Sequence, residues 1–269
     1  MTLRRVAVYA AVLAIAAWVA LPLLLITLAA FTPREVLYQW PRPLWPSRFS
    51  LDTLAFFLRS TGVWPATLRS VQVAVLTIAL SLALAAPAGY ALARYAFRGR
   101  EALQLLILSV KMFPATVLSV PLAVAFIRWG LYDTVVGVAA VHTALSVPFV
   151  TAIVTSVFAG VSYELEEAAL TLGSSRAQAV LRVTLPMAAP GLAAAAIFTF
   201  VLSWNEVFAA TILTLDRRTL PALIVDSVLG AGAPLPFRFA GGFFMVVPAL
   251  IIIFLIRRYL LTLWGVTVR

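Results

Sequence analysis

The sequence predicts an all-α integral membrane protein with six transmembrane helices. Of its 269 residues, 63% are hydrophobic and only 11% are charged, whereas a soluble domain carries about 25% charged residues. A helix needs about 20 apolar residues to cross the hydrocarbon core of a bilayer, and six runs reach about that length. A soluble core cannot hide several such runs, so we expect lipid to be the solvent of this chain.

The apolar runs give the expected positions of the spans. They cover residues 6–31, 67–93, 102–127, 134–159, 188–213 and 240–256. A signal peptide is an alternative for the first run, because Arg4 and Arg5 precede it and residues 27–29 could imitate a cleavage site. The apolar part of a signal peptide is only about 7 to 15 residues long. The length of the run therefore favours a membrane span.

Basic residues near the span ends predict the orientation of the chain. The main groups are Arg4 and Arg5, then Arg94, Arg98 and Arg100, then Arg257 and Arg258. Six crossings put all three groups on one side, which the positive-inside rule assigns to the cytoplasm together with both termini. Segment 32–66 would lie outside, although it carries four arginines. Its prolines and tryptophans indicate an irregular interfacial loop, and segment 214–239 is a second expected outer loop.

Several kinds of chemistry are excluded because residue types are missing. The chain has no cysteine, one histidine (His142) and one lysine (Lys111). A His-Glu-x-x-His zinc site needs two histidines, and a nucleotide-binding P-loop needs glycine before its lysine, where this chain has Val110. The net charge of +10 is spread as single or paired arginines between apolar runs, so we expect no nucleic-acid partner. Energy for any work has to come from a partner or an ion gradient.

The stretch 162–190 between the fourth and fifth spans is too polar to cross a membrane. Leu165, Ala168, Ala169 and Leu172 recur at i, i+3, i+4 and i+7, which predicts one apolar face of a short helix. Three glutamates, at 164, 166 and 167, fall in its first turn, where negative charge complements the helix dipole. Gly173 follows the last periodic residue, as expected at a helix C-terminus.

A second short helix follows the glycine. Ser174 or Ser175 can cap it, and the same apolar spacing continues to Thr184. We expect Pro186 and Pro190 to end this helix and begin the next span. From the residues alone, the hairpin either lies on the membrane surface or docks onto a partner protein.

A motif in the hairpin resembles that of a known family. It reads Glu167-Ala168-Ala169, three residues, Gly173, nine residues, an aliphatic residue, one residue, then Leu185-Pro186. This spacing is similar to the EAA signature of ABC importer permeases, in which the loop is the coupling helix that inserts into a cleft of the ATPase subunit. The resemblance implies a coupling role for Glu166, Glu167, Ala168, Ala169, Leu172, Gly173, Leu185 and Pro186.

Further motifs follow the order found in carbohydrate-importing permeases similar to the second permease subunit of the maltose transporter. They occupy segments 111–114, 120–122, 130–134, 148–149, 164–167, 190–192 and 203–206. The sequence departs from the family pattern at Leu172, where aspartate usually precedes the glycine. Residues 263–269 also replace the usual glycine-rich tail.

The resemblance implies a single ABC importer transmembrane domain over residues 1–269, with a permease core at about 67–260 and a cytoplasmic coupling loop at 162–187. The implied partners are a second permease subunit, two ATPase subunits that hold ATP and Mg²⁺, and an extracytoplasmic solute-binding protein. The implied cargo is a sugar, polyol or related carbohydrate, moved by alternating access through a bacterial or archaeal cytoplasmic membrane. For the chain itself we expect no catalytic residue, cofactor or metal.

Polar residues within the spans are candidates for the translocation path, because a charge inside a bilayer is costly and usually functional. Lys111 lies inside the third span, and Asn205 and Glu206 lie deep in the fifth. A Lys111–Glu206 ion pair is conceivable, and Pro114 can free backbone carbonyls to line a path. These four residues either line the path or pair between packed helices. For His142 we expect a hydrogen bond to a backbone group or hydroxyl rather than a proton relay.

A secondary carrier or channel driven by an ion gradient is the alternative function, with Glu206 or His142 moving protons. It would leave the hairpin without a task. A structural membrane scaffold is a third class, which predicts no solute-dependent ATP hydrolysis in any reconstituted assembly.

The predicted topology can be tested with single cysteine tags, because the chain has no native cysteine. Phe97→Cys and Ser175→Cys should both resist an impermeant thiol reagent added to intact cells, since we expect both positions in the cytoplasm. Leu44→Cys, in the expected outer segment, serves as the labelled control. Labelling of position 97 or 175 from outside would contradict the topology.

Overall fold

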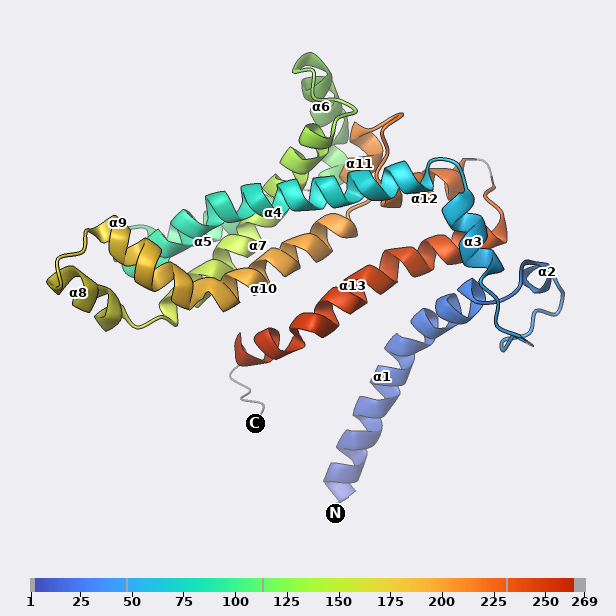
Figure 1. Cartoon of the computed structure of the whole chain (residues 1–269), viewed down its shortest axis with the longest axis horizontal. Helices are drawn as coiled ribbons and strands as arrows, with labels where there is room; N and C mark the ends of the chain where they lie inside the picture. Colours follow the sequence, from blue (N-terminus) through green and yellow to red (C-terminus); the bar gives the residue numbers. More distant parts are fainter. Residues whose placement is uncertain (1–2, 47, 113, 231, 264–269) are drawn as a thin grey trace. The chain divides into compact units, whose positions relative to one another are not determined.

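The computed structural model describes residues 3–46, 48–112, 114–230 and 232–263, and within these ranges all regular secondary structure is helical (Figure 1). The elements are α1 (Leu3–Ala30), α2 (Arg34–Leu37), α3 (Asp52–Arg59), α4 (Val63–Arg94), α5 (Arg100–Ser109), η1 (Val110–Met112), α6 (Ala115–Arg128), α7 (Val135–Ala159), α8 (Tyr163–Thr171), α9 (Arg176–Ala179), η2 (Val180–Thr184), α10 (Leu185–Trp204), α11 (Phe208–Leu213), α12 (Leu220–Leu229) and α13 (Leu235–Leu263). The all-α prediction is confirmed. Residue 113 of one motif, residues 264–269 of the tail and the side chains of Arg257 and Arg258 lie outside the description.

In the part of the chain that the structure describes, five helices are long and apolar enough to cross a membrane: Arg4–Ala30, Val63–Arg94, Val135–Ala159, Arg176–Trp204 and Leu235–Phe254. The expected third span, 102–127, is instead two helices, Arg100–Met112 and Val117–Arg128, that meet at an angle of 93°. Pro114 lies in the break, where it has no N–H to continue the helical ladder. Pro121 and Pro148 lie inside helices α6 and α7 and do not break them. The prediction of six spans holds if the bent pair counts as one.

The fifth span differs from the prediction at both ends. Its helix runs without interruption from Arg176 to Trp204, so Pro186 does not end the second hairpin helix. The turn η2 before it is a π-helix, in which the Leu185 N–H donates to the Val180 carbonyl five residues back. This wider turn accommodates Pro186, which has no N–H to donate. The span then ends at Trp204, and α11 is a separate helix.

Two segments that we expected to be loops contain helices. Segment 32–66 includes α2 and α3, and segment 214–239 includes α12. Helix α3 forms because one of its faces is buried, including Thr53 and Phe57. The Thr53 hydroxyl donates to the Thr32 carbonyl at 2.7 Å. Proline and tryptophan content alone did not reveal this packing.

The chain divides into two compact units, and each is described by itself. The first comprises Met1–Pro65 and Leu223–Pro248. Its centre is the fully buried ring of Phe57, whose centroid lies 4.9 Å from that of Phe237 and 5.3 Å from that of Phe244. This aromatic cluster fixes α3 against the first half of α13.

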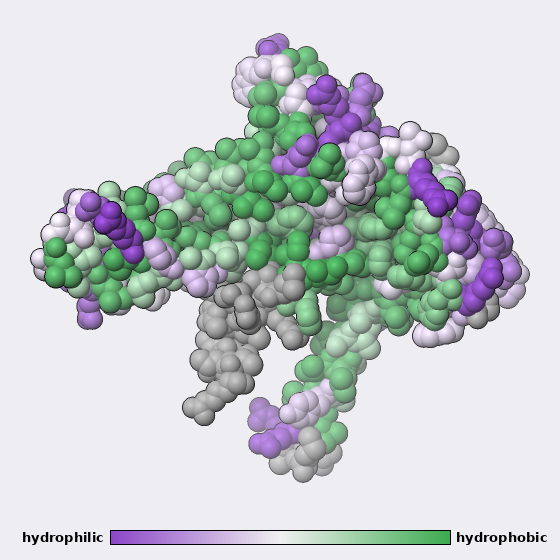
Figure 2. Space-filling view, in the orientation of Figure 1, coloured by the Kyte–Doolittle hydropathy of each residue, from purple (hydrophilic) through white to green (hydrophobic). Residues whose placement is uncertain are grey.

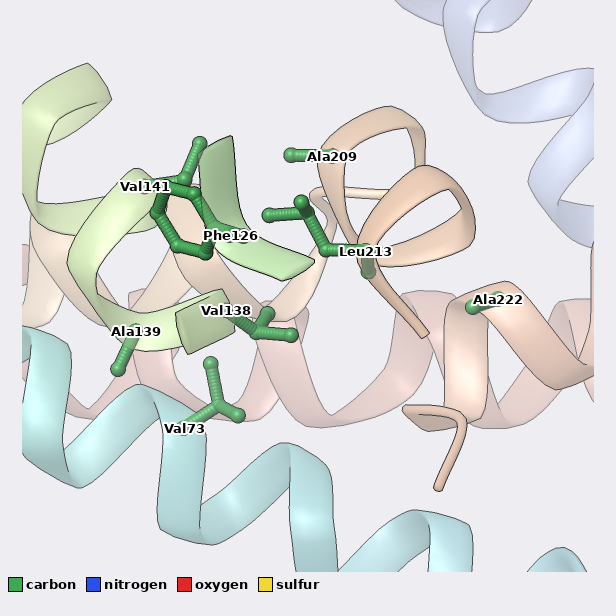
Figure 3. Close-up of a cluster of buried hydrophobic side chains, with 9 residues drawn as sticks. Val73, Phe126, Val138, Ala139, Val141, Ala209, Leu213 and Ala222 are labelled. Carbon is green, nitrogen blue, oxygen red and sulfur yellow. The ribbon is translucent and has the colours of Figure 1, made fainter. Parts of the chain in front are cut away.

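The second unit comprises Ala66–Ala222 and Ala249–Arg269, and α7 is its core. In an 18-residue apolar stretch of α7, 56% of the residues are buried, against 0–28% in the corresponding stretches of the other four unbroken spans. Figure 3 shows part of this core, where Val73 of α4 points toward Val138 and Ala139 of α7. Elsewhere hydrophobic residues dominate the exposed surface of α4 (Figure 2), as expected for a helix that faces lipid. Because the chain divides into two compact units, the expected single-domain organisation stays a prediction.

Glycines allow two helices to approach α7 closely, as small residues do in membrane proteins. A Cβ atom on Gly89 of α4 would lie 2.9 Å from Val154 Cγ1. A Cβ atom on Gly191 of α10 would lie 2.5 Å from Val157 Cγ1. Val157 is β-branched and cannot easily rotate away. The α7–α10 contact therefore requires glycine at position 191.

We expect Gly191→Ala to lower stability by about 1–3 kcal/mol, the usual cost of overpacking a core. The double variant Gly191→Ala with Val157→Ala should recover much of this loss, because it removes the two methyl groups that the new Cβ atom would meet. The measurement is the thermal unfolding of the detergent-purified protein. Equal instability of the single and double variants would contradict the proposed contact.

Candidate functional site

The predicted hairpin is present between the ends of α7 and α10 (Figure 1). Helix α8 ends before Gly173, which adopts a φ of 91° as expected for a left-handed turn. Ser175 rather than Ser174 caps α9. Its Oγ accepts from the Gln178 N–H at 3.3 Å, and the Gln178 Oε1 accepts from the Ser175 N–H at 3.0 Å. This capping box fixes the direction in which the chain leaves the turn.

The predicted apolar face of α8 is divided between two environments. Ala169 is buried against the chain. Leu165 is 42% exposed, Leu172 is 88% exposed and Ala168 is also exposed. The exposed residues follow each other at i, i+3 and i+7, so they form one stripe on the outside of the helix. Among the described residues of the chain, this stripe is left exposed.

Glu166 differs from the glutamates on either side of it. Glu164 and Glu167 are exposed, whereas Glu166 is buried. Its carboxylate accepts hydrogen bonds from the Tyr90 hydroxyl and, at 3.0 Å, from the Thr184 hydroxyl. We expected all three glutamates to complement the helix dipole, and for Glu166 the structure adds a set of side-chain partners. The sequence signal that could have shown Glu166 turning inward was the helical period. Successive residues in a helix are turned by about 100° and cannot all face solvent.

A second group of polar side chains surrounds a cavity of about 90 Å³ in the same unit. The residues lining it are Lys111, His142, Leu145, Ser146, Leu202, Ser203 and Glu206. The cavity thus brings together two of the four predicted path residues, Lys111 and Glu206. The other two do not line it: Pro114 lies at the helix break, and the Asn205 side chain donates to the Val201 carbonyl at 2.9 Å.

The conceivable Lys111–Glu206 ion pair is not formed in the structure. Instead, Glu206 Oε2 lies 3.0 Å from His142 Nε2, and His142 Nδ1 lies 2.9 Å from the Ser203 hydroxyl. The Lys111 ammonium lies 5.0 Å from the centre of the Phe149 ring, at a cation–π distance. The expected hydroxyl partner of His142 is therefore found, and sequence reasoning missed its carboxylate partner.

Glu206 also holds the break between α10 and α11. Its two carboxylate oxygens accept from the Ala209 N–H at 3.0 Å and the Ala210 N–H at 3.1 Å. These backbone donors begin α11 and have no partner within that helix. The carboxylate therefore caps one helix and binds His142 of another, which fixes the geometry of the cavity.

Comparison with known proteins gives the family. Residues 85–263 match the family described as the inner membrane component of binding-protein-dependent transport systems. The chain belongs to this family. The matched region includes the hairpin and the cavity, and the resemblance to ABC importer permeases is confirmed. As a family member with several apolar helices, this permease is a multi-pass protein of the inner membrane.

Relatives and solved structures agree with this assignment. An ABC transporter permease protein of Streptomyces antibioticus is 33% identical over 195 residues, which cover 72% of this chain and 85% of that protein. An arabinooligosaccharide transport system permease of Halalkalibacterium halodurans is 31% identical and covers 92% and 89% of the two chains. A chain in the crystal structure of a bacterial alginate ABC importer shares the fold, with a TM-score of 0.76, 21% identity and coverage of 95% and 96%.

Two variants of Glu206 test whether its charge serves transport or only structure. Glu206→Gln retains one oxygen that can cap α11 but loses the charge that faces His142. We expect the complex to assemble while uptake falls. Glu206→Ala also removes the cap, so the free energy of unfolding should fall by about 0.5–2 kcal/mol. The yield of folded protein should fall with it. The measurements are the amount of purified complex and the uptake per complex.

The opposite pattern would contradict a role in the path. If Glu206→Gln lowers the amount of complex while uptake per remaining complex is unchanged, the pair with His142 only holds helices together.

Proposed function

We propose that this permease is the membrane subunit of an ATP-driven importer of a sugar, polyol or related carbohydrate. The observation that carries the proposal is the hairpin, whose exposed stripe on α8 is followed by a helix that continues without interruption into a membrane span. An apolar stripe that its own chain leaves exposed suits a partner protein. The named transport activity of the arabinooligosaccharide relative supports the class of cargo.

The hairpin geometry suits docking on an ATPase subunit. Leu165 and Leu172 offer apolar side chains, and between them Ala168 lets a partner surface approach the helix backbone. Glu167 adds an exposed charge beside the stripe. Because residues 176–204 form one helix, a force on the hairpin reaches the membrane span through a continuous rod rather than a flexible loop. Closure of the two ATPase subunits would thereby change the side of the membrane to which the translocation path opens.

The proposed assembly has five kinds of component besides the lipid membrane: this chain, a second permease subunit, two ATPase subunits, an extracytoplasmic solute-binding protein and the carbohydrate. ATP and Mg²⁺ bind to the ATPase subunits, so that this chain holds no cofactor or metal and is not itself an enzyme. A structural neighbour, the alginate ABC transporter in complex with a periplasmic protein that carries a pentasaccharide, supports the solute-binding protein in this assembly. Binding of a panel of sugars and polyols to the solute-binding protein would identify the cargo.

The orientation in this proposal places both termini and the hairpin in the cytoplasm of a bacterium or archaeon, where ATP is available. Coupling is assigned to residues 166–169, Leu172, Gly173, Leu185 and Pro186, and the path to Lys111, Pro114, Asn205 and Glu206. Of the coupling set, the exposed residues of α8 would contact the ATPase. Gly173, Leu185 and Pro186 would set the angle between the hairpin and the span.

A carrier driven by an ion gradient is the competing function, and the His142–Glu206 pair could move protons in it. That function gives no role to the exposed stripe on α8. Purification distinguishes the two: a carrier transports alone, whereas an ABC permease copurifies with an ATPase.

Substitutions on the hairpin test the coupling function. Ala168→Trp places a bulky side chain in the middle of the stripe, so it should abolish solute-stimulated ATP hydrolysis and uptake. Ala168→Ser is the matched control, because it keeps the residue small. Glu167→Gln preserves shape and should have a milder effect. The measurement is ATP hydrolysis by the reconstituted complex with saturating binding protein and solute, and full stimulation in Ala168→Trp would contradict the function.

The turn residue gives an independent test. Apart from the two neighbouring residues in the chain, no atom of the described residues lies within 4 Å of a Cβ built on Gly173, so the cost of a side chain there comes from the positive φ and not from a clash. Gly173→Val should misdirect α9 at a cost of about 1 kcal/mol or more and reduce stimulated hydrolysis. Gly173→Asn should be tolerated, because asparagine adopts left-handed conformations more readily. Equal activity of the two variants would show that the turn geometry is not required.

A further inference from the structure

The buried carboxylate of Glu166 joins the hairpin to a membrane helix. Its Oε1 accepts from the Tyr90 hydroxyl of α4, and its Oε2 accepts from the Thr184 hydroxyl of η2 at 3.0 Å. Arg94 of α4 completes the set, with its Nε 3.4 Å from Oε2. The side chains of Arg94 and Glu166 are each only 7% exposed. Glu166 therefore binds both helices of the hairpin and α4 at once.

The partners of Glu166 are held in place by aromatic contacts. The Tyr90 ring meets the ring of Phe158, at the end of α7, edge-on with the centroids 5.5 Å apart. The Arg94 guanidinium carbon lies 5.5 Å from the centre of the Tyr163 ring, on the first residue of α8. Through these contacts the cluster links α4, α7, α8 and η2.

Burial makes these groups depend on one another. An ionised carboxylate or guanidinium is costly to bury unless it is paired. Glu166 is the acidic partner found for Arg94 within the described ranges. Because both carboxylate oxygens are occupied from inside, Glu166 is not available to a docked protein, whereas Glu167 is exposed beside the stripe and free to make such contacts.

We propose that Glu166 is a positioning residue that transmits movement of the hairpin to α4, and not a contact with the ATPase. The inference rests on the coupling function proposed above. Covalent continuity joins the hairpin to α7 and α10 only, through residues 160–162 and the continuous helix 176–204. The Glu166 cluster adds α4, so a push on α8 moves a third span. Without the cluster, α8 turns about Gly173 and the push is partly lost.

The test compares Glu166→Gln with Glu164→Gln, an exposed neighbour, in the assembled complex. Glu166→Gln removes the charge that faces Arg94 and leaves the exposed stripe unchanged. We expect the ATPase subunits to copurify normally. The α8 amides should exchange hydrogen about tenfold faster, the size expected when a hydrogen bond to a charged group is lost, and the solute imported per ATP hydrolysed should fall severalfold. Glu164→Gln should match the wild type in all three measurements.

Two uncharged changes keep the test valid if Glu166→Gln does not accumulate. Tyr90→Phe and Thr184→Val each remove one hydrogen bond to Glu166 and keep the Glu166–Arg94 ion pair, so neither leaves a buried charge without its ionic partner. Each should speed amide exchange in α8 and lower the solute imported per ATP, by less than Glu166→Gln. Unchanged exchange and unchanged coupling in both variants would overturn the proposal.

Other outcomes separate this proposal from the function on which it rests. Loss of the ATPase from the Glu166→Gln complex, with α8 exchange unchanged, would make Glu166 a docking contact and overturn the proposal. If the wild-type chain itself binds no ATPase, the proposed function fails. The amide exchange of the purified chain then still decides whether Glu166 fixes α8 to α4.

Discussion

The close packing of α7 against α4 and α10 is the interaction on which the rest of the second unit depends. Gly89 and Gly191 remove side-chain volume where the neighbouring helices approach Val154 and Val157. Lipid offers no hydrophobic gain for helix association, so van der Waals contact at such small residues has to supply it. Helix α7 also carries His142 of the cavity and, at its other end, Phe158 beside the hairpin cluster. These two residues lie about 24 Å apart along the helix axis.

Two carboxylates, the buried Glu166 and the partly buried Glu206, hold helices together at the hairpin and at the break between α10 and α11. Glu206 caps α11 at the break after α10 and binds His142. Glu166 holds α8 beside α4 and η2. A carboxylate buried in an apolar chain is stable only when several donors surround it. Each glutamate therefore binds helices that are distant in sequence. The hairpin is held in this way by Glu166, and the cavity by Glu206.

Much of the fold and part of the candidate site followed from local patterns. Apolar run length located the spans, since crossing a bilayer takes a minimum number of residues. Helical spacing with Gly173 and Ser175 located the hairpin, because caps and turns depend on neighbouring residues. Segments 32–66 and 214–239 were predicted less well. Their helices form against buried partners such as Thr32, and composition does not show which residues those partners will be.

By itself, the sequence determined the helical membrane class, the hairpin and the family. Tertiary structure alone decided that Glu166 turns inward and that His142 rather than Lys111 pairs with Glu206. It also decided that a π turn carries the hairpin into α10 past Pro186. The first group depends on contacts within a few residues, which periodicity records. The second depends on which side chains meet across different helices, and a buried charge takes whichever donors the packing brings to it.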